Sequence, residues 1–262
     1  YAPWFEGISI NYLGVVIPLE TNGTLGISIS SLATKEIEVT TPSYPNGTGE
    51  MYDAANTAVG ISYAKNLTNS FSIGVTAKYI NERIYNSNAT GFAFDIGTVY
   101  NTPYKNVRLG FSISNIGTKM QISGEDLNIS VDPVPSQNGN NDEILAKYNT
   151  DKFDMPLIMR VGLAWDAILN ENNRLTLAID GINPNDNDQS VNIGAEFAFL
   201  NEVFILRAGY NELFLQSSQK GLAFGAGFNL KNIGQTGIRA EYGYQRYKYL
   251  GDINRNTLII TF

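Results

Sequence analysis

The sequence predicts an all-β fold, an antiparallel transmembrane β-barrel, on three observations. Apolar and polar residues alternate with a period of two along most of the chain, as in Ser190–Leu200, where every second residue from Val191 to Phe199 is apolar. Many alternating segments have about ten residues or more, whereas globular strands usually have about 5–6 and membrane-spanning strands about 9–11. Longer connections tend to alternate with shorter ones, which is typical of barrels with short periplasmic turns and longer extracellular loops.

The alternation divides the chain into about thirteen predicted strands. They cover residues 6–18, 23–34, 57–66, 70–84, 90–101, 105–115, 157–168, 173–182, 189–199, 202–211, 219–230, 236–248 and 255–262. Single-chain bacterial barrels have an even number of strands with both chain ends on the periplasmic side. We therefore expect a fourteen-stranded barrel whose first strand precedes Tyr1. Because the sequence does not begin with Met, we interpret it as a mature or truncated form.

The free-energy cost of placing charge in lipid assigns the two faces of each strand. In 71–79, 157–166 and 221–230 one face is apolar and the other is small or polar. A Lys or Arg on the lipid face at mid-bilayer costs roughly 2–4 kcal/mol, so the face that carries mid-strand charges should line the lumen. We expect these charges to form ion pairs across the lumen: Lys78, Asp95, Arg108, Arg160, Asp166, Asp180, Glu196, Arg207, Arg239 and Glu241.

Alternation alone is equally compatible with a half-exposed soluble sheet whose charges face water. Strand length and the sorting of the loops favour lipid. Aromatic residues also gather near the ends of the segments, where interfacial girdles would lie. The final strand ends in "NTLIITF", with Leu258, Ile260 and Phe262 on one face. A terminal Phe on an amphipathic strand resembles the signal read by the bacterial outer-membrane insertion machinery. We therefore predict the bacterial outer membrane as the location, with membrane lipid and lipopolysaccharide as partners.

Two connections are long, at about residues 33–56 and 116–156, within a single barrel domain of residues 1–262. Loops beyond about 12–15 residues are usually functional or disordered. We expect both at the cell surface, as candidates for partner binding; the alternative is a generic surface-protecting loop. The candidate contact residues are Tyr44, Met51, Tyr52, Met120, Leu127, Tyr148 and Phe153.

Composition excludes several function classes. The chain has no Cys and no His, which removes thiolate and imidazole metal sites and most nucleophile–His catalytic sets. We find no catalytic set, metal site or cofactor motif, and we expect a protein that is not an enzyme. The net charge of −7 argues against nucleic acid as a partner. Several oxygen ligands fall within 180–188, but without the spacing of a calcium loop, so a hairpin turn is favoured.

The sequence from Asn66 to Thr102 (NLTNSFSIGVTAKYINERIYNSNATGFAFDIGTVYNT) resembles the central block of the PorV/PorQ family, outer-membrane proteins of Bacteroidota and related phyla. Leu109–Leu127 (LGFSISNIGTKMQISGEDL) resembles the following block, and 183–187, 192–197 and 207–210 resemble later landmarks. The resemblance covers nearly the whole chain. It implies a fourteen-stranded barrel similar to the long-chain fatty-acid transporter fold, with an N-terminal plug and a first strand that we expect to be missing here.

The resemblance also implies a role in type IX secretion. The best-understood members bind the C-terminal signal domain of secreted cargo and associate with a large translocon barrel or a cell-surface attachment complex. We therefore predict a non-enzymatic barrel that binds cargo or a partner barrel through its extracellular loops. The alternatives are a transporter of small hydrophobic compounds, by analogy of fold, and a general porin. The lumen should discriminate among them, because a conduit needs a continuous path whereas a docking barrel can be filled. Gly225 and Gly227 on the lumen face could make room for a plug or a ligand.

Overall fold

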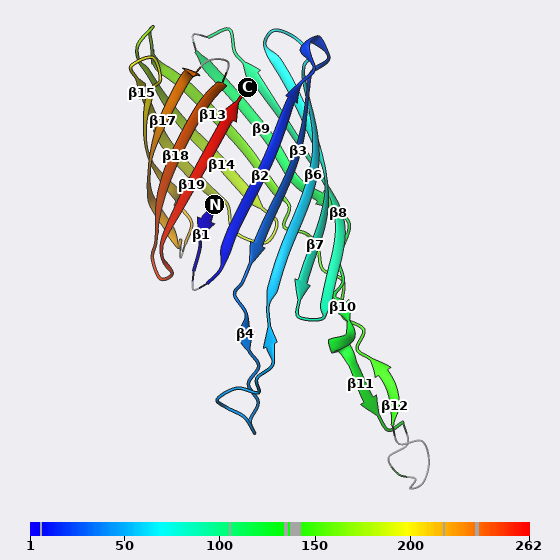
Figure 1. Cartoon of the computed structure of the whole chain (residues 1–262). Coiled ribbons are helices and arrows are strands. Elements are labelled where there is room, and N and C mark those ends of the chain that lie inside the picture. Colours follow the sequence, from blue (N-terminus) through cyan, green and yellow to red (C-terminus); the bar gives the residue numbers. More distant parts are fainter. Residues whose placement is uncertain (6, 105, 134–135, 137–142, 217, 234–235) are drawn as a thin grey trace.

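The computed structural model describes residues 1–5, 7–104, 106–133, 136, 143–216, 218–233 and 236–262. Within these residues, fourteen strands form one antiparallel sheet that curls into a nearly closed barrel (Figure 1). The fourteen wall strands follow one another around the barrel in chain order, so that each pairs with the wall strands that precede and follow it in the sequence. The predicted fold class is thereby confirmed. Among the described residues, no helix is both long enough and apolar enough to cross a bilayer.

The wall strands have these bounds: β1 Ala2–Pro3, β2 Ser9–Pro18, β3 Thr24–Ala33, β6 Ala54–Asn66, β7 Phe71–Ile84, β8 Ser87–Asn101, β9 Val107–Gly117, β13 Ile158–Leu169, β14 Arg174–Pro184, β15 Ser190–Phe199, β16 Phe204–Leu213, β17 Lys220–Ile233, β18 Thr236–Tyr247 and β19 Gly251–Thr261. The short elements are η1 Glu20–Asn22, β4 Ile37–Glu38, β5 Met51–Tyr52, β10 Ser123–Gly124, η2 Glu125–Leu127, β11 Asn128–Val131 and β12 Ile144–Lys147.

The thirteen strands predicted from alternation are β2, β3, β6 to β9 and β13 to β19. The structure adds β1 as the fourteenth. It lies in the seam between β2 and β19: Ala2 is in register with Ile10, and Tyr1 exchanges two backbone hydrogen bonds of 2.9 Å with Asn256. Because β1 is only two residues long, it pairs with the lower part of the seam in Figure 1. The plug that the family resemblance implies stays a prediction.

The connections are sorted between the two ends of the barrel. Short turns lie at one end, together with the C-terminus, and the long loops with β4, β5 and β10 to β12 project from the other end, which we call the mouth (Figure 1). One predicted connection was wrong: residues 86–89 are not a loop, because β8 begins at Ser87 directly after a tight turn at Tyr85, whose φ is +51°. The sorting agrees with the expected arrangement of an outer-membrane barrel.

The outer face of the wall is apolar. Cross-strand rows such as Leu13, Ile29, Val59, Tyr79 and Phe92 run in register around it. These side chains are exposed to the surroundings of the protein, with Leu13 at 65% and Phe92 at 60%. No second layer of the described residues covers them. Their burial must therefore come from hydrocarbon, and the fold and its apolar outer face are those of a bacterial outer-membrane protein, as the sequence predicted.

A small satellite core fixes the longest loop to the mouth. Met120 is 1% exposed and packs with Met155, Ala89 and Ala93, and two backbone hydrogen bonds of 2.9 Å join Met120 to Phe153. A Cβ on Gly91 would meet Met155 Cε and Met120 Cγ, so a side chain here would displace the two methionines of this core. The loop is thus anchored at its base on the inner side of β8.

Adjacent residues of β3 test the assignment of the faces. Ile27 lies on the outer face at 57% exposure and Ser28 lies on the inner face next to Gly60. We expect Ile27→Arg to lower the free energy of unfolding by about 2–4 kcal/mol, because the guanidinium would enter hydrocarbon. Ser28→Arg, one residue away, should change it by less than about 1 kcal/mol, because the lumen is polar. Denaturant unfolding in phospholipid vesicles measures both values; equal losses would contradict the assignment.

Candidate functional site

A continuous belt of polar contacts crosses the inner wall from β9 to β14. Arg108 Nη2 lies 3.1 Å from Asp166 Oδ1. The Thr176 hydroxyl donates to the same carboxylate at 2.6 Å, and Arg174 Nη1 donates to the Thr176 hydroxyl oxygen at 2.7 Å. The four residues come from three neighbouring strands, β9, β13 and β14, and lie toward their short-turn ends.

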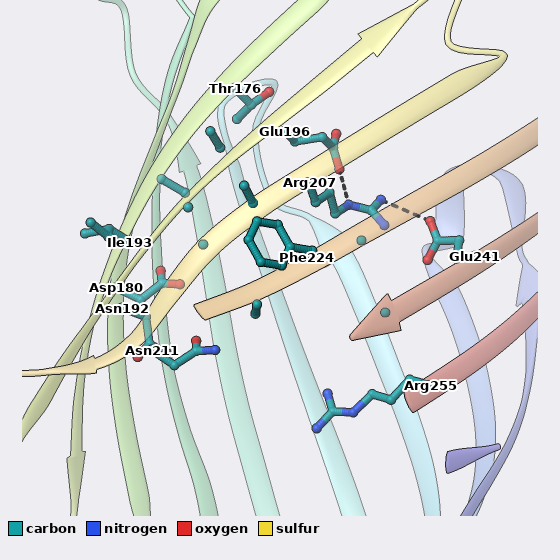
Figure 2. A pocket seen from close by; sticks show the side chains of 18 of the residues that line it. Thr176, Asp180, Asn192, Ile193, Glu196, Arg207, Asn211, Phe224, Glu241 and Arg255 are labelled. Atoms are coloured by element: carbon teal, nitrogen blue, oxygen red, sulfur yellow. Dashed lines mark hydrogen bonds and ion pairs between the residues drawn. The ribbon is translucent and has the colours of Figure 1, made fainter. Parts of the chain in front are cut away.

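The belt continues through β15 and β16 to β18. Arg174 lies 2.7 Å from Glu196, and Glu196 also accepts a hydrogen bond of 2.6 Å from Arg207 Nε. Arg207 reaches onward to Glu241 at 3.0 Å (Figure 2). Arg239 contacts the same carboxylate. Arg174 also pairs with Glu202 in the turn after β15 at 3.0 Å. Four arginines and four carboxylates balance along the belt, so that it carries no net charge.

Glycine makes the longest step of the belt possible. Arg207 on β16 and Glu241 on β18 lie on either side of β17, where Gly225 is in register with Arg207. A Cβ on Gly225 would lie 3.4 Å from Cβ and 3.7 Å from Cδ of Arg207. Because Gly225 has no side chain, the Arg207 side chain can extend across β17 to Glu241 on β18. Gly227, the other glycine noted in the sequence, lies beside Glu241, where a Cβ would be 3.7 Å from Cγ.

A second, smaller cluster lies on β7, β8 and β9. Lys78 Nζ is 2.7 Å from Asp95 Oδ1, and the backbone N–H of Asn115 donates to the same carboxylate at 2.8 Å. The Asn115 side chain accepts a hydrogen bond from Lys78 and donates to the Pro156 carbonyl at 2.8 Å. Asn115 has a φ of +64°, and the β8–β9 register shifts beside Asp95, between Phe94 and Ile96. This cluster ties the lumen wall to the far end of the long loop.

Eight of the ten charges predicted from the sequence therefore lie in ion pairs with one another. The other two, Arg160 and Asp180, have no ion pair within the part of the chain that the structure describes. Asp180 lies over Gly162 of the neighbouring strand, where an added Cβ would meet its Oδ1. Arg160 and Asp180 both line open space in the lumen.

The sequence analysis missed Arg174, Thr176 and Glu202. The signal for the first two was present, because Arg174 and Thr176 share the parity of Asp180 within one predicted strand. Glu202 lies in a turn with three consecutive left-handed residues, Leu200, Asn201 and Glu202 (φ 55°, 57° and 63°), and no alternation extends through such a turn. Its approach to Arg174 depends on that turn geometry.

The described residues enclose three cavities of comparable size in the lumen. Two of them, of about 630 Å³ and 690 Å³, share Asn192, Asn211 and Arg255 and therefore adjoin. The larger lies toward the mouth, where Trp4 and Ile10 face strands β13 to β19. The third, of about 630 Å³, lies against β6 to β9. Its inner wall is built of small residues: Ser62, Ala64, Ser72, Gly74, Thr76, Gly97, Gly110 and Ser112.

The mouth loops hold the predicted partner-binding residues in two different settings. Tyr44, Met51 and Tyr148 are exposed, at 63%, 45% and 62%. Tyr52 is half-buried with its ring 6.5 Å from that of Tyr85, and Leu127 is half-buried at the end of η2. Met120 is not available to a partner, because it lies in the satellite core that anchors the loop, and the half-buried Phe153 packs against that core. Two of the apolar side chains predicted to contact a partner therefore belong to the core of the loop or pack against it.

The root of the projecting hairpin β11–β12 is held by one carboxylate. Asp126 accepts hydrogen bonds from the backbone N–H of Asn86 (2.9 Å), from its side-chain amide (3.1 Å) and from the Ser87 hydroxyl (3.0 Å). In the neighbouring loop, the hydrogen bond from Arg83 lowers the pKa of the Asp53 carboxyl below its usual value. Phe262, the predicted insertion signal, lies at the short-turn end with 96% exposure.

Comparisons with known proteins show the fold. No protein-family model matches the chain, and no curated protein matches it. The solved structure of the Pseudomonas putida toluene transporter TodX superposes with a TM-score of 0.59 at 12% identity, covering 99% of this chain and 86% of that one. The CymD monoaromatic hydrocarbon channel gives 0.51 at 12% identity, covering 97% and 86%. The chain has the fold of outer-membrane hydrocarbon transporter barrels. Neither comparison supports the PorV/PorQ family specifically.

The belt should contribute to stability through its partly buried ion pairs. We expect Arg207→Met to lower the free energy of unfolding by about 1–3 kcal/mol, because it leaves Glu196 and Glu241 with one partner fewer each in a partly desolvated lumen. Arg160→Met on the same face is the matched control and should cost less than about 0.5 kcal/mol, because it breaks no ion pair. Denaturant unfolding in vesicles gives both values, and equal losses would show that the belt contributes nothing to stability.

Proposed function

We propose that this barrel passes small hydrophobic compounds across the outer membrane. The open space in the lumen is the observation that carries the proposal. Each of the three cavities lies within the range of about 300–1,000 Å³ that small-molecule sites occupy. The likeness in fold to a toluene transporter and a monoaromatic hydrocarbon channel supports the same role.

Paired charges and short side chains occupy different parts of the inner wall, and this arrangement supports an open conduit more than a filled barrel. The charges of the belt are paired with one another on β9 to β18 and have no net charge left to attract ions. The part of β6 to β9 that lines the third cavity is made mostly of short side chains, with Asp95 of the Lys78–Asp95 pair among them, and leaves its space open. A neutral, weakly hydrated solute loses little hydration along such a wall. The ion pairs that we expect across the lumen join neighbouring strands, or strands separated by one other, along its wall instead.

Two adjacent residues of β9 provide a test. Gly110 faces the lumen in register with Gly162, and a Cβ there would meet nothing within 4 Å. Leu109 faces outward at 41% exposure. In a Gram-negative host without its own hydrocarbon transporter, the barrel should raise the uptake of labelled toluene severalfold. Gly110→Trp should remove most of that gain by obstructing the lumen, and Leu109→Trp should retain it.

Unchanged uptake in the presence of the barrel would reject the proposed function. Equal uptake by both Trp variants would show that the compound does not pass along this wall. Outer-membrane levels of the three proteins, measured by heat-modifiable gel mobility, separate a blocked lumen from a failure to insert.

The projecting hairpin favours a second candidate function, docking of secreted cargo or a partner barrel as in type IX secretion. β11 and β12 extend beyond the mouth and pair only with each other (Figure 1). Their apolar side chains are exposed, with Leu145 at 77% and Ile144 at 41%. An isolated two-stranded hairpin is at best marginally stable in water, and an exposed apolar surface of this kind often marks an interface.

Replacing residues 128–147 with a short Gly-Ser linker tests this second candidate. If the hairpin binds cargo or a translocon barrel, the variant should insert normally but lose co-purification of that partner from native membranes in mild detergent. The matched control replaces residues 37–52 of the other long loop and should retain the partner. A wild-type barrel that purifies without either partner would reject the docking function.

A further inference from the structure

Two unsatisfied donors in the mouth cavity point to a ligand. Among the described residues, two buried side-chain nitrogens have no hydrogen-bond partner, Nε1 of Trp4 and Nε2 of Gln245. Both residues line the 690 Å³ cavity near the mouth, although they are far apart in the chain. Leaving a buried donor unpaired costs about 1–3 kcal/mol, and more than about 90% of such groups are paired in native proteins. Their convergence on one cavity indicates a place for an acceptor.

Unpaired cations line the same cavity. Arg160 on β13 and Arg255 on β19 both face it, and within the described chain neither has a carboxylate at ion-pair distance. The four belt arginines, by contrast, each have at least one. Figure 2 shows Arg255 extending into open space across from Asn192 and Asn211. Two guanidinium groups provide planar pairs of donors that match a carboxylate.

The acidic groups of this cavity do not neutralise these arginines. Glu212 is engaged by Lys220 at 2.8 Å and by the Ser218 hydroxyl at 3.1 Å. Asp186 and Asp188 are exposed residues of the loop between β14 and β15, at the rim of the mouth. The two unpaired cations lie within strands, below that loop. Among the lining residues below that loop, the cationic side chains therefore outnumber the carboxylates.

Apolar side chains complete the lining. Ile10, Ile158, Ile182, Tyr247 and Ile253 face the cavity from five strands. Ile253 and Tyr247 are buried at 3% and 7% exposure, and Phe5 packs edge-on against Tyr247 at 5.4 Å between ring centroids. A ligand that fits must therefore present both an apolar body and an anionic, acceptor-rich group.

We propose that the mouth cavity binds a small organic carboxylate, with an aromatic or short aliphatic body, as an entry site of the lumen. The carboxylate is held by Arg160 and Arg255, Trp4 and Gln245 supply further donors, and the isoleucines contact the apolar body. This inference rests on the proposed function, because it assigns a class of solute to the same lumen. It differs in that an uncharged hydrocarbon would leave all four donor side chains without an acceptor.

Trp4 can report on the site directly. The chain has two tryptophans, and Trp165 faces outward at 45% exposure, so the Trp165→Phe variant leaves Trp4 as the single emitter. Benzoate titrated into this protein in detergent micelles should change Trp4 emission with saturation, and added salt should weaken the binding. Arg255→Gln and Arg160→Gln should each raise the Kd by about 10- to 100-fold, as expected for a charged hydrogen-bonded pair.

Arg246→Gln is the matched control, because Arg246 lies on the same β18–β19 hairpin but on the outer face and should leave the Kd unchanged. Benzamide, the neutral counterpart of benzoate, should bind at least tenfold more weakly. Absence of saturation, equal binding of benzoate and benzamide, or unchanged binding in Arg160→Gln and Arg255→Gln would each overturn the inference. Circular dichroism and gel mobility confirm that each variant is folded.

Toluene uptake separates this inference from the proposed function. Benzoate binding without toluene uptake leaves the carboxylate site standing and rejects hydrocarbon passage. Toluene uptake without benzoate binding supports hydrocarbon passage and rejects the carboxylate site.

Discussion

The structure depends on one constraint, which is that a strand crossing lipid must have its backbone groups paired and its charges turned away from hydrocarbon. The fourteen-stranded antiparallel wall satisfies the first condition through pairing between neighbours, and β1 carries the pairing into the seam between β2 and β19. Alternation satisfies the second, because every residue that faces outward is followed by one that faces inward. The polar network of the lumen is therefore a consequence of the membrane before it is a functional device.

The same constraint explains how much the sequence could predict. Period-two alternation located thirteen strands, and the parity of Lys78, Glu196 and Arg207 placed them on one face without any knowledge of the fold. The partners were harder to foresee, because Arg207 and Glu241 meet across an intervening strand and that step depends on Gly225 and on inter-strand register. Loop residues were hardest. Met120 looked like a surface contact, yet the fold of its own loop buries it, and no periodicity encodes that.

The structural comparisons show the fold of outer-membrane barrels, and a barrel of this kind can host unrelated functions. The two candidate roles use different parts of the molecule. Transport depends on the lumen wall of β6 to β9, whereas docking depends on the β11–β12 hairpin outside the barrel. The two regions share no residue, so selection could act on each without disturbing the other.

The two ends of the lumen differ in whether their polar groups are paired. This difference matters more for the proposed function than the overall polarity of the lumen does. Toward the short turns, arginines and carboxylates pair with one another in a belt without net charge. Toward the mouth, Arg160, Arg255, Trp4 and Gln245 have donors without acceptors among the described residues. Unpaired groups lower stability and are retained where something else pairs with them. Under the proposed function, a solute that enters at the mouth would meet unsatisfied donors first and a belt of paired charges afterwards.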